Sequence, residues 1–176
     1  MQKIRTLSTF AMILMLPMML YYPYQAMVWN LNLSFLDQGA WTRNDVWVDV
    51  DAQIATATRV VFFVVWTIPV VLGSLSYLLA FMTLVLVRQG IVFDYRVARR
   101  LRLLGIFVFS SSVSSLLGGA ISPMIRSWHN ADGPLPLRFW YNSSEIGLAF
   151  CGLAFLFWGI VMREAIRIAR ENEEFI

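Results

Sequence analysis

The sequence predicts an all-α membrane protein in which four transmembrane helices form one bundle. Of its 176 residues, 59% are hydrophobic and only 14% are charged, and the mean hydropathy is +0.64. Soluble domains average about 45–50% apolar and about 25% charged residues. The apolar residues also gather into four stretches, each close to or above the ~20 residues that cross a bilayer as a helix. Because the backbone must satisfy its own hydrogen bonds in lipid, these stretches are predicted to be helices.

The predicted spans make the chain a single membrane domain. They cover residues 7–29, 60–87, 103–125 and 146–162. Between them lie two external loops, 30–58 and 126–144, and one cytoplasmic loop, 88–102, and the last segment is a cytoplasmic tail, 163–176. Little of the sequence remains for a soluble catalytic domain.

The first span is predicted to stay in the membrane as a helix. Lys3 and Arg5 precede it, as in a signal peptide, but it is longer than a signal sequence and no small-x-small cleavage site follows. Aromatic residues gather at its far end instead, which is typical of a helix that meets the membrane interface. They are Tyr21, Tyr22, Tyr24 and Trp29. Pro17 and Pro23 are predicted to kink this helix or to end its regular part.

The basic residues predict that both termini lie in the cytoplasm. Ten of the 14 Lys and Arg residues fall on one side of the predicted spans and four on the other. The ten are Lys3, Arg5, Arg88, Arg96, Arg99, Arg100, Arg102, Arg163, Arg167 and Arg170, and the four are Arg43, Arg59, Arg126 and Arg138. The side richer in Lys and Arg faces the cytoplasm in multi-pass proteins.

The first external loop contains an acidic segment. Residues 46–51 partly alternate apolar and acidic side chains, which is typical of a short strand or an extended segment. Asp49 and Asp51 would then share a face and could offer oxygen ligands to a cation. We favour a solvated acidic face, since no ligand set resembles a dedicated calcium loop.

The second external loop contains the only histidine, His129, and leads to Glu145 at the outer end of the last span. A lone histidine cannot form a metal site, so His129 is interpreted as an interfacial or pH-responsive residue. Glu145 is predicted to stabilise the start of its helix, because its carboxylate lies at the positive end of the helix dipole. A polar contact inside the bundle is the alternative. Asp49, Asp51 and Glu145 are the candidates for sensing an external signal.

The third span contains small residues at helical spacing. Ser111, Ser115 and Gly119 recur every fourth residue, a pattern that lets helices approach closely. Tight packing is the favoured interpretation, and a polar seam or small cavity that binds a ligand is the alternative. The single cysteine, Cys151, is predicted to pack between apolar side chains, and it excludes an intrachain disulfide.

Catalytic and cofactor motifs are absent from the sequence, so we expect no enzyme, no cofactor and no metal site. It contains no metal-binding histidine–glutamate motif, phosphate-binding loop or nucleophile elbow. No ionisable residue lies in the middle of a predicted span, which argues against a pump, an ion-coupled transporter or a voltage sensor.

Two cytoplasmic segments are candidates for contact with a partner protein. In the first, Gly90 is predicted to end the second helix and Asp94 to cap the next. The second segment is the tail that begins at Arg163. Acidic and basic residues alternate along it, and those three or four residues apart can form ion pairs on a helix. Anionic lipid and solvent would also account for these charges. The residues predicted to contact a partner are Arg99, Arg100, Arg102, Arg167 and Glu171.

The same two segments resemble a known family. The carrying residues are Gly90, Phe93, Val97, Arg99, Arg100, Leu101, Arg102 and Gly105, together with the tail from Arg163 to Ile176. They are similar to the signature of the bacterial membrane family described as domain of unknown function 2975, although residues 94–96 depart from it. The resemblance implies a multi-pass protein of the bacterial inner membrane. It also implies a small helix-turn-helix regulator as the cytoplasmic partner.

We therefore expect a non-enzymatic membrane protein that senses a signal or regulates by tethering a cytoplasmic partner. Its other partner is the lipid bilayer, direct nucleic-acid binding is not expected, and self-association into a homo-oligomer stays open. The alternatives are a small-molecule transporter or channel subunit, an intramembrane enzyme or enzyme subunit, and a structural subunit of a membrane complex.

Overall fold

The computed structural model describes residues 2–36, 41, 48–49, 52–139 and 143–173, and the described residues form helices and loops without a strand. Helix α1 (Gln2–Leu31) continues into a π-helical turn, η1 (Asn32–Leu36). Three long helices follow: α3 (Thr56–Arg88), α4 (Tyr95–Arg126) and α5 (Ser143–Glu173). Four helices are long and apolar enough to cross a membrane, which confirms the predicted fold class. Every helix extends beyond its predicted span, and Arg96, Arg99, Arg100 and Arg102 belong to α4, as expected if Asp94 caps this helix.

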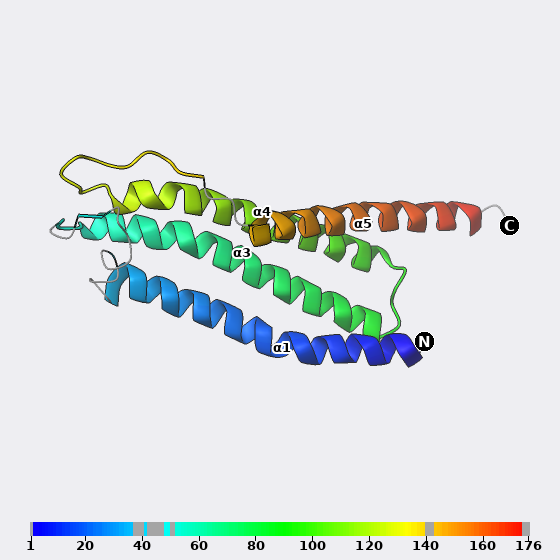
Figure 1. Ribbon diagram of the computed structural model, residues 1–176. Helices are drawn as coiled ribbons and strands as arrows, with labels where there is room; N and C mark the ends of the chain where they lie inside the picture. Colours follow the sequence, from blue (N-terminus) through cyan, green and yellow to red (C-terminus); the bar gives the residue numbers. More distant parts are fainter. Residues whose placement is uncertain (1, 37–40, 42–47, 50–51, 140–142, 174–176) are drawn as a thin grey trace.

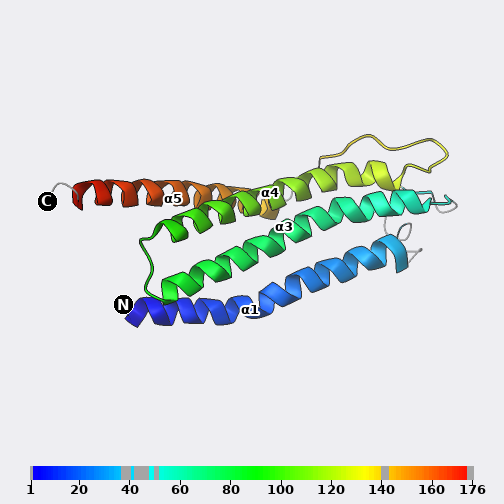
Figure 2. The same cartoon turned by 180° about the vertical axis from the view of Figure 1, so that it is seen from behind.

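Helices that follow one another in the sequence pack side by side (Figures 1 and 2). Helix α1 packs on α3, α3 on α4, and α4 on α5. Because neighbours run antiparallel, the N-terminus of α1, the α3–α4 loop and the C-terminal half of α5 lie at one end of the molecule. We call this the basic end, because it holds the ten Lys and Arg residues grouped above, and we call the opposite end the loop end.

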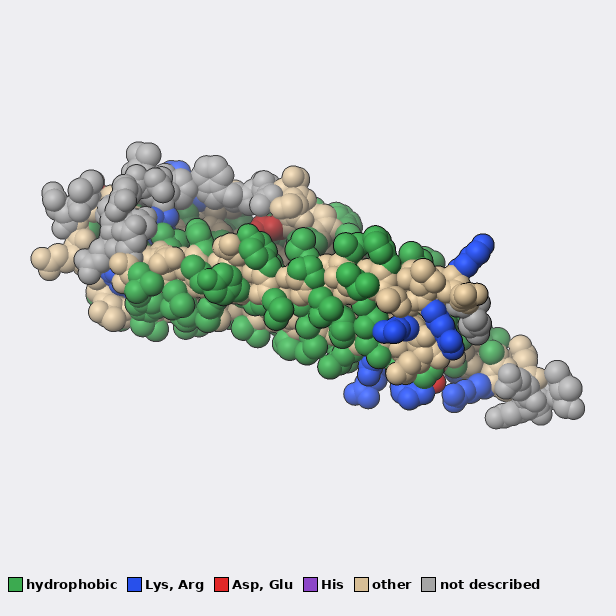
Figure 3. Space-filling view, turned by 90° about the horizontal axis from the view of Figure 1, so that it is seen from below, with side chains coloured by type: hydrophobic (Ala, Val, Ile, Leu, Met, Phe, Trp, Pro, Cys, Tyr) green, Lys and Arg blue, Asp and Glu red, His purple; other side chains and the backbone are tan. Residues whose placement is uncertain are grey.

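The surface between the two ends is largely apolar, as expected for side chains that face lipid. Figure 3 shows hydrophobic side chains along the middle of the molecule and Lys and Arg side chains gathered at the basic end. Helices α1 and α5 expose large apolar side chains, such as Leu20, of which 73% is exposed, and Phe150, of which 68% is exposed. Soluble monomers rarely expose large apolar surfaces, so this exposure agrees with four membrane-crossing helices.

Helix α1 stays helical through both of its prolines. Pro17 and Pro23 lie inside α1, which ends only at Leu31. Figure 2 shows α1 bending near its middle. By its position in the sequence Pro17 also lies near the middle of α1, and it lacks the N–H that would bond the preceding turn. The buried Asn30 then ties α1 to α3, because its Nδ2 donates to the Phe63 carbonyl and to Thr67 Oγ1, each at 3.1 Å.

The contact between α4 and α5 depends on three glycines. A Cβ atom at Gly152 would lie 2.6 Å from the Phe109 backbone nitrogen, and one at Gly159 would lie 2.6 Å from that of Arg102. A Cβ at Gly105 would lie 2.6 Å from the Gly152 carbonyl oxygen. The two backbones are therefore in direct contact, which only glycine permits.

We expect Gly105→Ala to destabilise the α4–α5 contact, because the nearest atoms belong to the backbone of α5 and cannot move independently. The expected loss is about 1–3 kcal/mol, the usual effect of overpacking, measured as a lower Tm of the purified protein in detergent. Gly119→Ala is the matched control on the same helix, since no described atom lies within 4 Å of its added Cβ. Equal Tm values for the two variants would contradict the glycine contact.

Candidate functional site

A cavity of about 520 Å³ lies between the helices, and all four long helices contribute to its wall. This volume falls in the range of about 300–1,000 Å³ that is typical of small-molecule sites. Most of the wall is apolar, and its polar side chains are hydroxyls and one carboxylate. The polar members are Tyr22 of α1, Ser76 and Tyr77 of α3, Ser111, Ser112 and Ser115 of α4, and Glu145 of α5. The sequence alternative of a small cavity beside the serines therefore has a structural counterpart.

Glu145 lies in the first turn of α5, as predicted, and this turn lies opposite the middle of α4, where Glu145 makes the polar contact inside the bundle that was the alternative prediction. Ser115 Oγ donates a hydrogen bond to Glu145 Oε1 at 2.6 Å, and Ser112 Oγ donates one to the Glu145 carbonyl. From Ser115, α4 continues for 11 more residues to Arg126, which is about 16 Å along the helix axis. An ionisable group therefore lies between the apolar parts of the helices, although it belongs to the first turn of α5 and not to the middle of a predicted span.

The connection between α4 and α5 explains why Glu145 lies so deep. After α4 ends, the chain turns back and runs beside the last turns of that helix (Figure 1). The Leu135 N–H donates to Ser127 Oγ at 2.8 Å, and the Arg138 N–H donates to the Ala120 carbonyl at 3.2 Å. These bonds hold the returning segment against α4, so α5 begins near the middle of its neighbour.

The predicted small-residue stripe divides between different neighbours. Ser111 Oγ donates to the Pro69 carbonyl of α3 at 2.9 Å, and Ser115 bonds to α5. Gly119 has no described atom near its added Cβ, so its predicted role in close packing is wrong. The adjacent Gly118 packs against Val65 instead. Two of the three predicted packing residues thus face the cavity.

Tyr22 is a cavity residue that sequence reasoning assigned to the membrane interface. Its ring lies 5.5 Å from that of Tyr77, and its side chain also packs over Gly73. The neighbouring Tyr21 and Tyr24 are exposed, as predicted for an interfacial belt. Tyr22 is far in the sequence from Gly73 and Tyr77, so no local pattern indicated the contact.

Asp49 and His129, two residues of the predicted external loops, make hydrogen bonds between these loops at the loop end. Asp49 Oδ2 accepts the Ala131 N–H at 2.9 Å, and the Asp49 N–H donates to Asn130 Oδ1 at 3.1 Å. His129 Nε2 accepts the Ala55 N–H at 3.4 Å at the start of α3. Asp51 and most of the predicted strand lie outside the described residues. In the described part of the chain, no three His, Cys, Asp or Glu residues are placed to hold a metal ion.

A groove at the basic end is formed by Tyr95 and the C-terminal half of α5. Its lining residues are Tyr95, Ile160, Arg163, Glu164, Ile166, Arg167, Arg170 and Glu171, and its volume is about 400 Å³. The Arg163 guanidinium lies 5.4 Å from the centre of the Tyr95 ring. Beyond this contact α5 continues past the other helices (Figures 1 and 2). Ile166 is buried where α5 passes Tyr95, whereas Arg167, Ile168, Arg170 and Glu171 of the projecting part are exposed.

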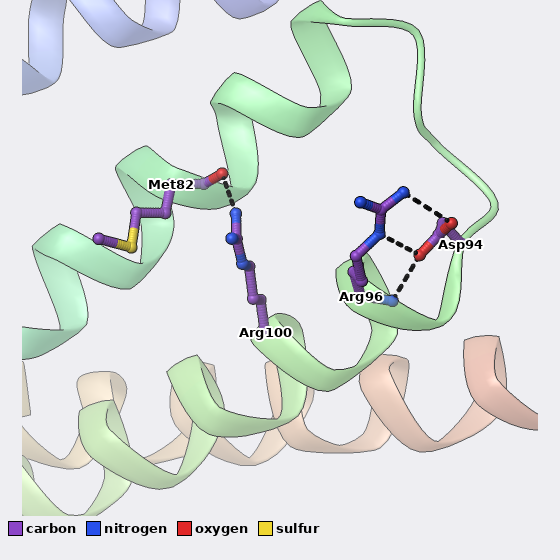
Figure 4. Close-up of polar contacts among 4 residues, drawn as sticks. All are labelled: Met82, Asp94, Arg96 and Arg100. Carbon is purple, nitrogen blue, oxygen red and sulfur yellow. Dashed lines mark hydrogen bonds and ion pairs between the residues drawn. The ribbon is translucent and has the colours of Figure 1, made fainter.

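Two of the five residues predicted to contact a partner line the groove. Arg167 and Glu171 line the groove, where Arg167 also pairs with Glu164. None of Arg99, Arg100 and Arg102 lines the groove. Arg100 instead reaches α3, where its Nη1 donates to the Met82 carbonyl at 2.5 Å (Figure 4).

The α3–α4 loop is built as the sequence predicts. Gly90 adopts a φ of +87°, which favours glycine, and ends α3. Asp94 caps α4, because its Oδ1 accepts the Arg96 N–H at 2.7 Å and the Arg96 Nε–H at 3.1 Å (Figure 4). These hydrogen bonds, with a smaller contribution from Arg170, hold the pKa of Asp94 below its usual value. Phe93, beside the cap, is 83% exposed.

Comparisons of the chain with models of protein families, with curated proteins and with solved structures found no match. The class of the protein is therefore defined by its structure alone. It has four helices able to cross a membrane, and its two candidate surfaces are the interhelical cavity and the charged groove at the basic end.

We expect the Asp94 cap to persist at neutral pH and to weaken only as the pH falls through the lowered pKa of this carboxyl group. The Arg96 amide proton, followed by NMR, should shift with a midpoint below the usual aspartate range. Asp94→Asn should abolish this titration while keeping an oxygen that caps the helix. A midpoint at the ordinary aspartate pKa would contradict the Arg96 contact.

Proposed function

We propose that the chain is a non-catalytic membrane protein that holds a partner protein at its basic end and so regulates or senses. The observation that carries this proposal is the extension of α5 beyond the other helices, with a groove along its exposed half. A helix end that only closed a bundle would not need to extend past its neighbours.

The chemistry of the groove suggests what a partner would present. Arg163, Arg167 and Arg170 line it together with the exposed Ile160, so it offers both positive charge and apolar contact. The ion pairs of Arg167 with Glu164 and Glu171 are exposed, and such pairs contribute little stability. They can therefore exchange for contacts with a partner. We expect a partner segment with acidic side chains beside an apolar anchor.

The basic end is proposed to face the cytoplasm, following the rule that Lys and Arg concentrate there. The resemblance to the domain of unknown function 2975 supports the bacterial inner membrane as the location and a small helix-turn-helix regulator as the partner. Both remain predictions that an unbiased search for the partner can test.

Site-specific crosslinking tests the docking surface directly. A photo-crosslinking amino acid in place of Ile168, an exposed residue of the projecting half of α5, should capture one cytoplasmic protein in native membranes. The same amino acid in place of Leu148, an exposed residue near the start of α5, is the control and should capture none. Mass spectrometry identifies the captured protein, which also reports the side of the membrane that the basic end faces.

Two double variants locate the contact. Arg163→Gln with Arg167→Gln should reduce the crosslink about tenfold or more, because charge-assisted contacts are lost. Arg99→Gln with Arg102→Gln removes the same charge from residues that do not line the groove and should leave the crosslink unchanged. Equal losses in both variants would indicate general attraction, and no protein captured at position 168 would contradict the proposal.

A small-molecule transporter or channel subunit is the second candidate function, and the interhelical cavity is the observation that favours it. Reconstituted liposomes would show ligand-dependent flux in that case, whereas a tethering protein would show none.

A further inference from the structure

We propose that the interhelical cavity binds an organic cation, a protonated amine attached to an apolar group, with the Glu145 carboxylate as its counter-ion. This inference goes beyond partner binding, and it does not require that the docking proposal be correct. It follows from the composition, the charge and the size of the cavity.

The first step is the charge balance of the cavity. Glu145 is its only ionisable lining group apart from Cys151 and the tyrosines, and no Lys, Arg or His of the described chain lines the wall. Ser115 occupies one carboxylate oxygen of Glu145, and in the described residues no donor bonds to the other. An ionised carboxylate in an apolar site is unfavourable unless it is paired. The arrangement therefore favours a ligand that supplies a positive charge and N–H donors.

The second step is the choice between a metal ion and an organic cation. Calcium and magnesium need about six or more oxygen ligands, several of them charged, and the described residues hold no cluster that could supply them. The remainder of the wall is apolar, with residues such as Val108, Leu148 and Phe155. These side chains fit the hydrocarbon part of an amine and would not solvate a bare ion.

The third step is the position of the aromatic rings. Tyr22 and Tyr77 line the same cavity, with ring centres 5.5 Å apart. Aromatic faces attract ammonium groups within about 6 Å, and the attraction is stronger away from water. The hydroxyls of Ser111 and Ser112 donate to carbonyls of the protein and keep lone pairs that can accept an ammonium N–H. One carboxylate, two rings and several hydroxyls thus surround an apolar space of about 520 Å³.

A matched pair of probes tests the proposal. Radiolabelled adamantylamine and adamantanol share the same hydrocarbon cage and differ in charge. Binding is measured to the purified protein in nanodiscs of zwitterionic lipid, and binding to empty nanodiscs is subtracted. We expect the amine to bind about tenfold or more tightly than the alcohol, the factor expected of one charge-assisted contact. Equal affinities of the two probes would overturn the proposal.

Variants then assign the binding to Glu145. Glu145→Gln keeps a carbonyl oxygen that accepts from Ser115, so it removes the charge and retains the hydrogen bond. It should lower the affinity for the amine to that for the alcohol. Glu164→Gln, on the projecting part of α5, is the charge-matched control and should leave both affinities unchanged. A Tm of the Glu145→Gln protein equal to that of the wild type confirms that the variant is folded.

The single cysteine gives an independent measure of location. Cys151 lines the cavity and is exposed, so the prediction that it packs between apolar side chains is wrong. Bound adamantylamine should therefore slow its reaction with N-ethylmaleimide in the wild-type protein and not in Glu145→Gln. Amine binding that leaves the reaction rate unchanged would place the ligand elsewhere and overturn the assignment. These measurements need no partner protein, so their failure would leave the docking proposal untouched.

Discussion

The backbone contact between α4 and α5 fixes the positions of both candidate surfaces. Gly105, Gly152 and Gly159 bring the two helices so close that a slip by one turn, about 5.4 Å, would force larger residues into the interface. This register places Glu145 beside Ser115 and, at the other end of the contact, Arg163 over Tyr95. A different register would separate the carboxylate from the serines and would remove Tyr95 from the groove.

The same helix connects the two surfaces physically. The N-terminal half of α5 contributes Glu145, Leu148, Cys151 and Phe155 to the cavity, and its C-terminal half forms most of the groove. Because α5 packs mainly on one neighbour, a change in its tilt at the cavity is carried along a continuous helix to the groove. A ligand alters partner binding by this route only if it binds one tilt of α5 more tightly than another.

Composition and local motifs predict where the helices lie in the sequence, but they do not predict which residues of neighbouring helices contact one another. Four spans follow from the apolar runs, and Gly90 and Asp94 mark the α3–α4 loop because a turn and a cap depend on residues close in sequence. The depth of Glu145 could not be predicted, since it depends on the hydrogen bond between Arg138 and Ala120 that returns the chain along α4. Tyr22 was assigned to the interface for the same reason: its partners lie on another helix.

Most of the described polar side chains between the helices have hydrogen-bond partners on a neighbouring segment, and Glu145 is the charged group that is only partly satisfied. Asn30 donates twice to α3, Ser111 donates to the Pro69 carbonyl, and Ser127 both donates and accepts beside the returning segment. The buried indole N–H of Trp66 has no acceptor among the described residues, but it is neutral and its desolvation is modest. Among the described residues, Glu145 has only Ser115 as a side-chain donor, and a carboxylate needs more partners than a neutral group in an apolar surrounding. An acid left half-satisfied beside a cavity is understandable when a ligand completes its coordination, which a purely structural role does not require.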